Sequence, residues 1–396
     1  MVDSKEVKSG EKIRYLEGLR GIAAIIVVFC HLRVTCFIVE HGSFNASIEK
    51  LPIPEIGRTL IINSIGKLFD GNLSVWIFWV LSSYVISIQF FKPHQEYHKI
   101  LISSFSKRYV RLLIPVLVSV LFAWLLLQGG FMYNKQLGLL LGSPYDRWLP
   151  TYYNFNANLW GALRSAFYET FFNFQSSTTY NYVLWTIRNE FLGSLFIFGI
   201  FGVIRHNSKR YILYGIILTI LLLLQIHWLC AFVLGYILCD YDYSIKNNKY
   251  LDTIKRIEGK MHAFNFMILV VSLLMVVFGE QIMTWLGLTN SCRSLILSVA
   301  IVYFCLRNKY YRSFFSSKVP YWLGKVSFGV YLIHWPIICS LTSYLLIHNH
   351  TAQGKMVASI TTIFLVLVGG HFFTKYVDRN AIAFSNRIGD FFKKAA

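Results

Sequence analysis

The chain carries little charge for its length. Of its 396 residues, 14% are Asp, Glu, Lys or Arg, whereas a soluble domain has about 25%. Hydrophobic residues make up 55%, so polar side chains could not cover a water-exposed surface. The 38 basic residues outnumber the 19 acidic ones, but a nucleic-acid-binding domain would not be this apolar, and we expect no nucleic-acid partner. The class that remains is an all-α, polytopic membrane protein.

Several short motifs of soluble enzymes are also missing. The chain has no Walker-type glycine loop, no HExxH and no GxSxG. Its seven cysteines form no CxxC pair and lie in or beside apolar segments, where a free cysteine behaves as a small hydrophobic residue. The histidines of the apolar segments lack the spacing of metal ligands. We therefore expect no metal site and no tightly bound cofactor.

Long apolar segments divide the chain. About 20 apolar residues are enough to cross a bilayer, and ten candidate spans are present. They cover residues 15–37, 72–91, 112–131, 185–204, 211–226, 228–241, 264–282, 292–306, 327–347 and 357–377. The sixth and eighth are short, and a tight turn near His227 is expected to join the fifth to the sixth.

The distribution of basic residues predicts the orientation of these spans. If both termini are cytoplasmic, most of the 38 lysines and arginines fall in inner segments, as is typical of membrane proteins. We therefore predict about ten transmembrane helices with cytoplasmic N- and C-termini, surrounded by the lipids of the cell (cytoplasmic) membrane. They form a single membrane domain over residues 1–396.

The longest segment outside the spans covers about residues 132–184 and is predicted to be extracytoplasmic. It is rich in Trp, Tyr and Phe but is no separate soluble domain. Aromatic residues of this kind anchor half-buried helices at the membrane interface. They can also form a platform for the apolar ring faces of a sugar, and the two interpretations are compatible.

The first span contains ionisable residues, which are costly at membrane depth and are therefore candidate functional residues. Arg20 and His31 are 11 residues apart, so on an α-helix they share a face about 16 Å apart. Glu17 is one turn from Arg20 and can pair with it. His31 is either a core histidine bonded to a neighbouring helix or a general base, for which imidazole is well suited. Without His31, Arg20 would be interpreted as an anchor at the membrane surface.

A basic segment opens the third span. Arg108 and Arg111 lie one turn apart at its cytoplasmic mouth. They are either the ordinary positive charge of an inner loop or a bidentate clamp for phosphate. Lys107 is interpreted as ordinary inner-loop charge. His371 in the tenth span has no motif around it and is interpreted as structural.

Two later spans carry further polar groups. Glu190 lies about one turn into the fourth span and needs a partner there: Arg188, another arginine or a substrate hydroxyl. Tyr331 and His334 share one face of the ninth span at i and i+3. Pro336 follows them and is expected to kink the helix and open space beside them.

Four segments carry these groups in a fixed order. They are YLEGLRGIAAIIVVFCH (15–31), FSKRYVRLLIP (105–115), LWTIRNEF (184–191) and SFGVYLIHWPI (327–337). The set resembles the acyltransferase-3 family of integral-membrane O-acyltransferases and extends over nearly the whole chain. The resemblance implies a ten-helix domain that takes acyl-CoA, commonly acetyl-CoA, from the cytoplasm as co-substrate. It also implies an acceptor hydroxyl on a surface, secreted or lipid-linked glycan.

The resemblance also assigns residues. His31 matches the essential histidine of the family and Arg20 its first-span arginine. Arg108 and Arg111 match the pair that binds acyl-CoA, and in the resulting hypothesis Arg20 joins them in holding its nucleotide phosphates. Cys30 stands where many members carry another residue, and this change removes no required group.

Glu190, Tyr331 and His334 match polar positions of the family whose roles are less defined. In the resulting hypothesis, His31 removes the proton of the acceptor hydroxyl, Glu190 helps to position the acceptor, and Tyr331 stabilises the oxyanion. Direct transfer and an acyl-histidine intermediate are both compatible with the sequence. The alternative is a transporter or flippase that uses the same residues as a substrate or proton path, although the chain lacks the internal repeats common in transporters.

Overall fold

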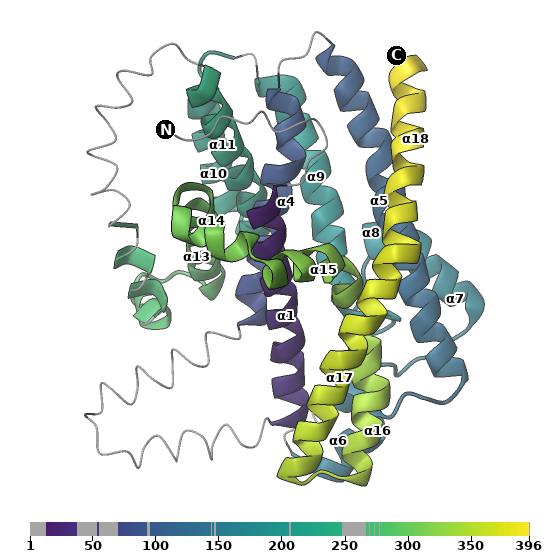
Figure 1. The fold of residues 1–396 in the computed structure, drawn as a ribbon. Coiled ribbons are helices and arrows are strands. Elements are labelled where there is room, and N and C mark those ends of the chain that lie inside the picture. The colour runs from purple at the N-terminus through teal and green to yellow at the C-terminus, as the bar shows by residue number, and fades with distance from the viewer. Residues whose placement is uncertain are drawn as a thin grey trace.

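The computed structural model is a bundle of long helices, with short helical segments between some of them (Figure 1). It describes residues 13–37, 70–92, 96–143, 148–205, 207–247 and 278–395, with 54, 145, 267–268, 270–272 and 274–276. Every regular element within these ranges is helical, as predicted for an all-α membrane protein.

The helices differ widely in length. Those of eight or more residues are α1 (Arg14–Cys36), α4 (Gly71–Phe91), α5 (Tyr97–Gln128), α6 (Asn134–Leu141), α9 (Trp185–Ile204), α10 (Arg210–Leu223), α11 (His227–Asn247), α13 (Asn290–Arg307), α14 (Lys309–Ser316), α15 (Lys318–Ile337), α17 (Ala352–Phe373) and α18 (Arg379–Ala395). The shorter segments are η2 (Leu149–Thr151), α7 (Leu159–Arg164), η3 (Ser165–Glu169), α8 (Thr170–Phe172), η4 (Tyr182–Leu184), η5 (Ile338–Thr342), α16 (Ser343–His348) and η6 (Thr374–Asp378).

Seven helical stretches of the described chain are long and apolar enough to cross a membrane. They are Arg14–Cys36, Gly71–Phe91, Tyr97–Gln128, Tyr182–Ile204, Asn290–Arg307, Lys318–His348 and Ala352–Ala395. They correspond to the first four and the last three predicted spans.

The three middle spans account for the difference from the predicted count of ten. Helix α10 has only 14 residues, and α11 carries Asp240 and Asp242 in its second half, so neither is among the seven. The described residues of the predicted span at 264–282 are helical, but undescribed residues interrupt them, so this span is not among the seven either. The tight turn near His227 is confirmed, with Gln225 at φ 57° between α10 and α11. Seven of the predicted spans are therefore helices of sufficient length and apolarity to cross a membrane, whereas the count of ten and the orientation of the termini stay predictions.

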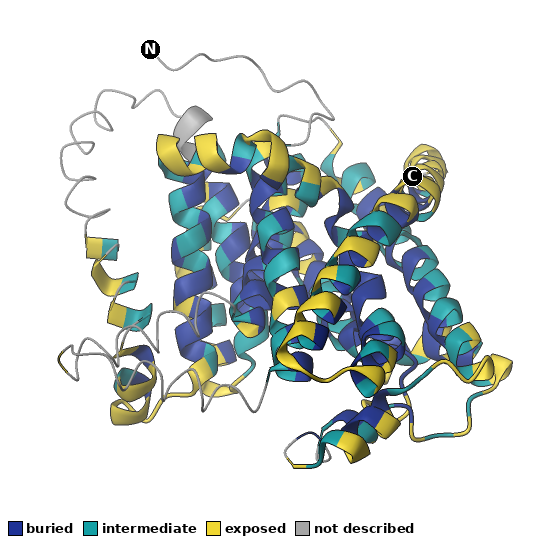
Figure 2. Ribbon diagram, turned by 60° about the horizontal axis from the view of Figure 1, so that its bottom comes forward, coloured by how far each residue is buried: buried dark blue, intermediate teal, exposed yellow. Residues whose placement is uncertain are grey.

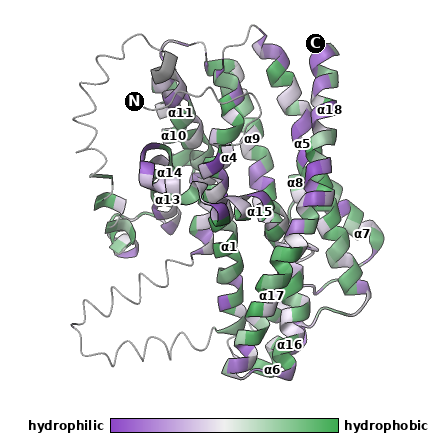
Figure 3. Cartoon of the chain, viewed as in Figure 1, coloured by the Kyte–Doolittle hydropathy of each residue, from purple (hydrophilic) through white to green (hydrophobic). Residues whose placement is uncertain are grey.

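Several helices continue beyond the predicted spans. Helix α5 begins at Tyr97 rather than at residue 112, and α17, η6 and α18 form one continuous stretch to Ala395. Figure 3 shows the apolar α17 passing into an α18 with many hydrophilic positions. The length of the apolar segment underestimates the length of such a helix, because an amphipathic extension has apolar residues on only one face. In α18 that face packs along α5, and the two helices lie side by side in Figure 1.

Small residues bring the inner helices close together. Helix α1 packs against α15, α4 and α14, and α4 packs against α11. A Cβ added at Gly235 of α11 would lie 2.4 Å from the carbonyl oxygen of Val80 in α4. Close backbone approach of this kind stabilises helix pairs in membranes. Figure 2 shows buried residues on the inward faces of the helices, and six of the seven free cysteines are among the buried residues, as predicted.

The described part of the segment 132–184 contains the short helices α6, η2, α7, η3, α8 and η4. Side chains such as Leu149, Phe171 and Tyr180 are buried against the bundle, whereas Trp160 is 75% exposed. The segment thus combines packed rings with exposed ones, in line with half-buried helices at a membrane interface.

Candidate functional site

Two histidines from distant parts of the chain meet inside the bundle. Nδ1 of His31 on α1 lies 3.0 Å from Nε2 of His334 on α15, and the two rings are stacked with centroids 5.1 Å apart. His334 is fully buried, whereas His31 is partly accessible. The sequence put these residues in separate spans and could not show that they touch.

The bonding partners of His334 indicate where the protons of the pair lie. Nδ1 of His334 is 2.7 Å from the carbonyl oxygen of Tyr331. A carbonyl oxygen only accepts hydrogen bonds, so this nitrogen carries a proton. In a neutral imidazole the other nitrogen is then an acceptor, and Nε2 of His334 accepts the Nδ1–H of His31. Nε2 of His31 therefore keeps its lone pair, which is the state that a general base requires.

A close crossing of α1 and α15 brings the two histidines together. A Cβ added at Gly21 would lie 2.3 Å from the backbone nitrogen of Gly324, and one at Gly324 would lie 2.1 Å from the carbonyl oxygen of Glu17. The backbones touch here because both positions lack a side chain. His31 and His334 each follow their glycine by ten residues, so the two helices run parallel from the crossing to the histidine pair.

Arg20 joins the same two helices. Its Nε donates to Oγ of Ser327 at 3.0 Å, and its Nη2 donates to the Glu17 carboxylate at 2.9 Å and to the Gly324 carbonyl at 3.2 Å. The predicted pairing of Arg20 with Glu17 is confirmed. These bonds hold α1 and α15 in register, so Arg20 helps to position His31 against His334.

Aromatic rings of the segment 132–184 reach the histidine pair through Trp335. The Trp335 ring meets His31 edge-on, with centroids 5.2 Å apart, and the side chain is 1% exposed. Tyr152 and Trp148 pack against Trp335 at 4.8 and 5.6 Å. Tyr152 and Trp148 of this aromatic-rich segment are therefore separated from His31 by a single ring, that of Trp335.

The backbone carbonyl and the side-chain hydroxyl of Tyr331 form hydrogen bonds with different residues. Its carbonyl binds His334, whereas its hydroxyl lies 2.8 Å from Oγ1 of Thr186 and donates to the Val183 carbonyl at 3.2 Å. The hydroxyl therefore faces α9 and its preceding turn. Directly after Pro336 and Ile337, α15 gives way to the π-helix η5, which agrees with the distortion expected at the proline.

Glu190 and Arg108 form an ion pair between α9 and α5. Nη2 of Arg108 binds the Glu190 carboxylate, which also accepts a hydrogen bond from Ser82 of α4. Nε of Arg108 donates to Oγ of Ser194 at 2.8 Å. The side chains of Arg108 and Glu190 are only 13% and 17% exposed. Of the partners considered for Glu190, the structure selects another arginine, so the two predicted residues belong to one network.

Arg111 pairs with an acidic residue that the sequence did not single out. Its Nη2 lies 2.7 Å from Oδ1 of Asp378, which is the last residue of the π-helix η6. The guanidinium also lies over the ring of Phe328 at 5.4 Å. Arg108 and Arg111 are therefore each held by a carboxylate from another element.

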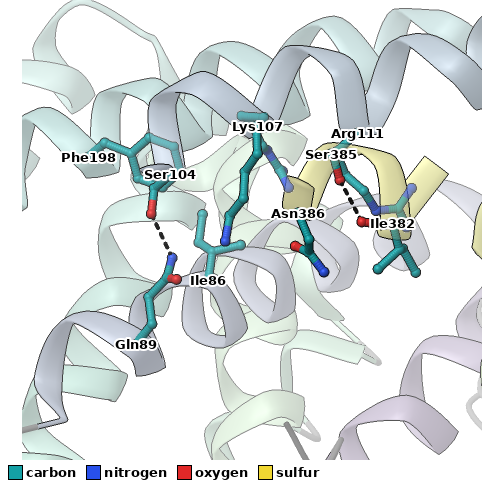
Figure 4. Close-up of a pocket in the computed structure, with 10 residues that line it drawn as sticks. Ile86, Gln89, Ser104, Lys107, Arg111, Phe198, Ile382, Ser385 and Asn386 are labelled. Atoms are coloured by element: carbon teal, nitrogen blue, oxygen red, sulfur yellow. Dashed lines mark hydrogen bonds between the residues drawn. The ribbon is translucent and has the colours of Figure 1, made fainter. Parts of the chain in front are cut away.

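A cavity of about 190 Å³ lies beside these arginines (Figure 4). Lys107, Arg108 and Arg111 line it from α5, and Ser385 and Asn386 line it from α18. The remaining lining residues are neutral: Ile86, Gln89, Ser104, Phe198 and Ile382. Three cationic and no acidic side chains line the wall, so the cavity favours an anion such as phosphate.

The predicted site residues fall into two groups in space. Tyr331, His334 and His31 gather in one part of the contact between α15 and α1, and Arg108, Glu190 and Arg111 gather around α5. Arg20 lies at the same helix contact, but about 16 Å along α1 from His31. Sequence reasoning interpreted Lys107, which lines the cavity, as ordinary inner-loop charge, and it did not single out Asp378. The signal for Lys107 was its place beside Arg108 in the same basic motif, whereas Asp378 had no motif around it.

Comparisons with known proteins point to the same chemistry. The model of a family described as an acyltransferase domain matches residues 13–374. The O-acetyltransferase PaAT-1 of Phomopsis amygdali is 24% identical over 451 residues, which cover 96% of this chain and 85% of that protein. No solved structure matches the chain significantly. The resemblance carried by the four motifs is thereby confirmed over most of the chain.

Proposed function

Because the chain belongs to this membrane acyltransferase family, we propose that it is an O-acyltransferase that uses acyl-CoA from the cytoplasm. The transferred group is acetyl, in keeping with the activity named for the relative from Phomopsis amygdali. The acceptor is a hydroxyl of an extracytoplasmic or lipid-linked glycan.

The observation that carries the proposal is the hydrogen-bonded pair of His31 and His334. An alcohol is a weak nucleophile at neutral pH, and removal of its proton during attack contributes about 10²–10⁴-fold to the rate. The pair supports this task because Nε2 of His31 has a free lone pair and His334 fixes the ring. A purely structural histidine would not need its second nitrogen left available.

The reaction follows from this arrangement. Nε2 of His31 accepts the proton of the acceptor hydroxyl as the hydroxyl oxygen bonds to the thioester carbon. The carbon–sulfur bond then breaks, and the CoA sulfur leaves with the proton held by His31, so the base is regenerated. Arg20 positions His31, and the aromatic rings packed on Trp335 support the acceptor side. Tyr331 can assist an oxyanion only by releasing its hydroxyl from Thr186 and Val183.

The proposed binding of the acyl-CoA donor is based on the cationic cavity. Arg108 and Arg111 line it, and guanidinium groups suit phosphate oxygens by charge and geometry. Glu190 holds Arg108, so we assign Glu190 to donor-side positioning rather than to contact with the acceptor. A transporter would use similar intramembrane charges, but the family match favours group transfer.

A replacement experiment in the native host tests this function. The gene is deleted and complemented with wild type, His31→Ala or His371→Ala, and the acyl content of the cell's glycans is measured by mass spectrometry. His371 is an exposed histidine of α17, so it is the matched control. We expect acylation to be lost with His31→Ala and retained with His371→Ala. Full acylation by His31→Ala at normal protein level would refute the proposal.

A further inference from the structure

The C-terminal helix α18 forms one wall of the cationic cavity, although the family match ends at residue 374, the first residue of η6, and so before α18. Ser385 and Asn386 line the cavity from this helix, and Figure 4 shows Asn386 between Ile86 of α4 and Arg111 of α5. The cavity is therefore incomplete without residues that lie beyond the family match.

Small residues on α18 keep this wall close to α5. Ala381, Ser385 and Gly389 repeat every four residues and are all buried. A Cβ added at Gly389 would lie 2.6 Å from Oγ of Ser103 and 3.3 Å from Cδ of Lys107. The backbone of α18 at Gly389 thus packs directly on side chains of α5, including Lys107, which fixes Asn386 relative to the basic side chains of α5.

Lys107 is the cation of the cavity that a ligand can use most directly. Arg108 is bound by Glu190 and Arg111 by Asp378. Among the described residues Lys107 has no carboxylate within ion-pair distance, and only the longer-range attraction of Asp390 on α18 acts on it. Figure 4 shows its side chain extended beside the cavity, with Asn386 near it. A lysine ammonium and an asparagine amide both donate hydrogen bonds, so together they suit phosphate oxygens.

We propose that α18 and Lys107 form a phosphate-binding site in which Lys107, Asn386 and Ser385 contact a phosphate group of the acyl-CoA donor. This assignment rests on the proposed function. The cavity of about 190 Å³ is smaller than the 300–1,000 Å³ typical of sites for whole small molecules, so it holds a phosphate or diphosphate group while the rest of CoA extends outside it.

Substitutions at Asn386 test the site with opposite signs of charge. Asn386 is exposed at the rim, so its variants should fold. Asn386→Asp adds a negative charge to the wall, and Asn386→Lys adds a positive one. Asn380→Asp is the matched control, because Asn380 lies on the same helix, is exposed and is not part of the cavity wall.

The measurement is calorimetric binding of CoA and of inorganic pyrophosphate to the full-length protein in phosphatidylcholine nanodiscs. We expect Asn386→Asp and Lys107→Gln each to weaken the binding of both ligands by about tenfold or more. Lys107→Gln removes a positive charge that attracts phosphate, and Asn386→Asp adds a negative charge that repels it. Asn386→Lys should tighten both, and Asn380→Asp should match wild type.

The outcomes separate this inference from the proposed function. Equal affinities for Asn386→Asp, Asn386→Lys and Asn380→Asp, with CoA still bound, would overturn the role of α18 and leave the proposed function intact. Pyrophosphate binding that depends on Asn386, without any CoA binding, would support the phosphate site and refute acyl-CoA as donor. Displacement of pyrophosphate by phosphatidic acid but not by CoA would assign the cavity to a lipid headgroup and overturn the donor assignment.

Discussion

At the scale of single residues, the site depends on which atoms of each side chain remain available. His334 uses Nδ1 for the Tyr331 carbonyl and Nε2 for His31, so it has no nitrogen left for a substrate. It is a positioning residue, and His31 is the residue whose free nitrogen can react. The same reasoning applies to Arg108, whose Nε and Nη2 are bound by Ser194 and Glu190.

Removal of His334 should reduce turnover without weakening donor binding. His334→Ala leaves the His31 ring without its partner, and loss of such an orienting group costs about 10–100-fold in activity. We expect kcat to fall by this factor while the Kd for CoA is unchanged. His348→Ala is the control, since His348 bonds a carbonyl one turn away but is exposed on α16. Equal kcat values for the two variants would contradict a positioning role.

The Arg108–Glu190 pair should show strong energetic coupling. Loss of either partner leaves the other charge largely buried and unpaired, which is costly. In a double-mutant cycle with Arg108→Gln and Glu190→Gln, we expect a coupling free energy of about 0.5–3 kcal/mol. The measurement is denaturant unfolding of the purified protein. Additive changes would mean that the two side chains do not depend on each other.

At the scale of helices, backbone contact between α1 and α15 sets the geometry of the histidine pair. The two helices touch at Gly21 and Gly324 and run in the same direction from there. Ten residues further along each helix, His31 and His334 meet. Arg20 reinforces the register. The YLEGLRG motif of the first span therefore has two roles. Its glycines permit the close helix crossing, and its charged residues form the hydrogen bonds of Arg20.

A methyl group at the crossing should separate the helices. Gly21→Ala places a Cβ against the Gly324 backbone, and overpacking of this kind costs about 1–3 kcal/mol. We expect a lower thermal midpoint and reduced acyl transfer. Gly215→Ala in α10 is the matched control, because a Cβ there meets nothing within 4 Å. If Gly21→Ala behaves like Gly215→Ala, the crossing does not set the site.

At the scale of the whole molecule, the candidate site residues form two separate groups, which we propose serve the two sides of one reaction. The histidine pair lies beside aromatic residues of the segment 132–184, which we predict to be extracytoplasmic. The cationic cavity lies between α5 and α18. We predict that the basic residues at the start of α5 and in α18 are on the cytoplasmic side. This division lets a donor and an acceptor approach from opposite sides of the membrane.

Labelling of introduced cysteines tests this orientation. Ser177 and Ser313 are both exposed, in the segment 132–184 and in α14, so Ser→Cys at each is a matched pair. In a background without native cysteines, a membrane-impermeant maleimide should label Ser177→Cys in intact cells. It should label Ser313→Cys only after the membrane is opened. The reverse pattern would invert the predicted topology.

The sequence predicts the helical class, seven of the spans and the identity of the family, because apolar length and local motifs are visible along the chain. It also predicts the local pair of Glu17 and Arg20. It cannot predict contacts between spans, such as His31 with His334 or Arg108 with Glu190, since many pairings of the same helices satisfy the pattern. Helix extensions such as α18 were missed because amphipathic segments fall below the apolar threshold of a span.

The central claim is that His31 activates the acceptor hydroxyl. The most direct measurement is the rate at which membranes holding the native glycans incorporate label from labelled acetyl-CoA. Membranes with His31→Ala should incorporate label at least about 10²-fold more slowly than wild type, while His371→Ala and CoA binding remain unchanged. Label incorporation by His31→Ala at the rate of His371→Ala would contradict the account.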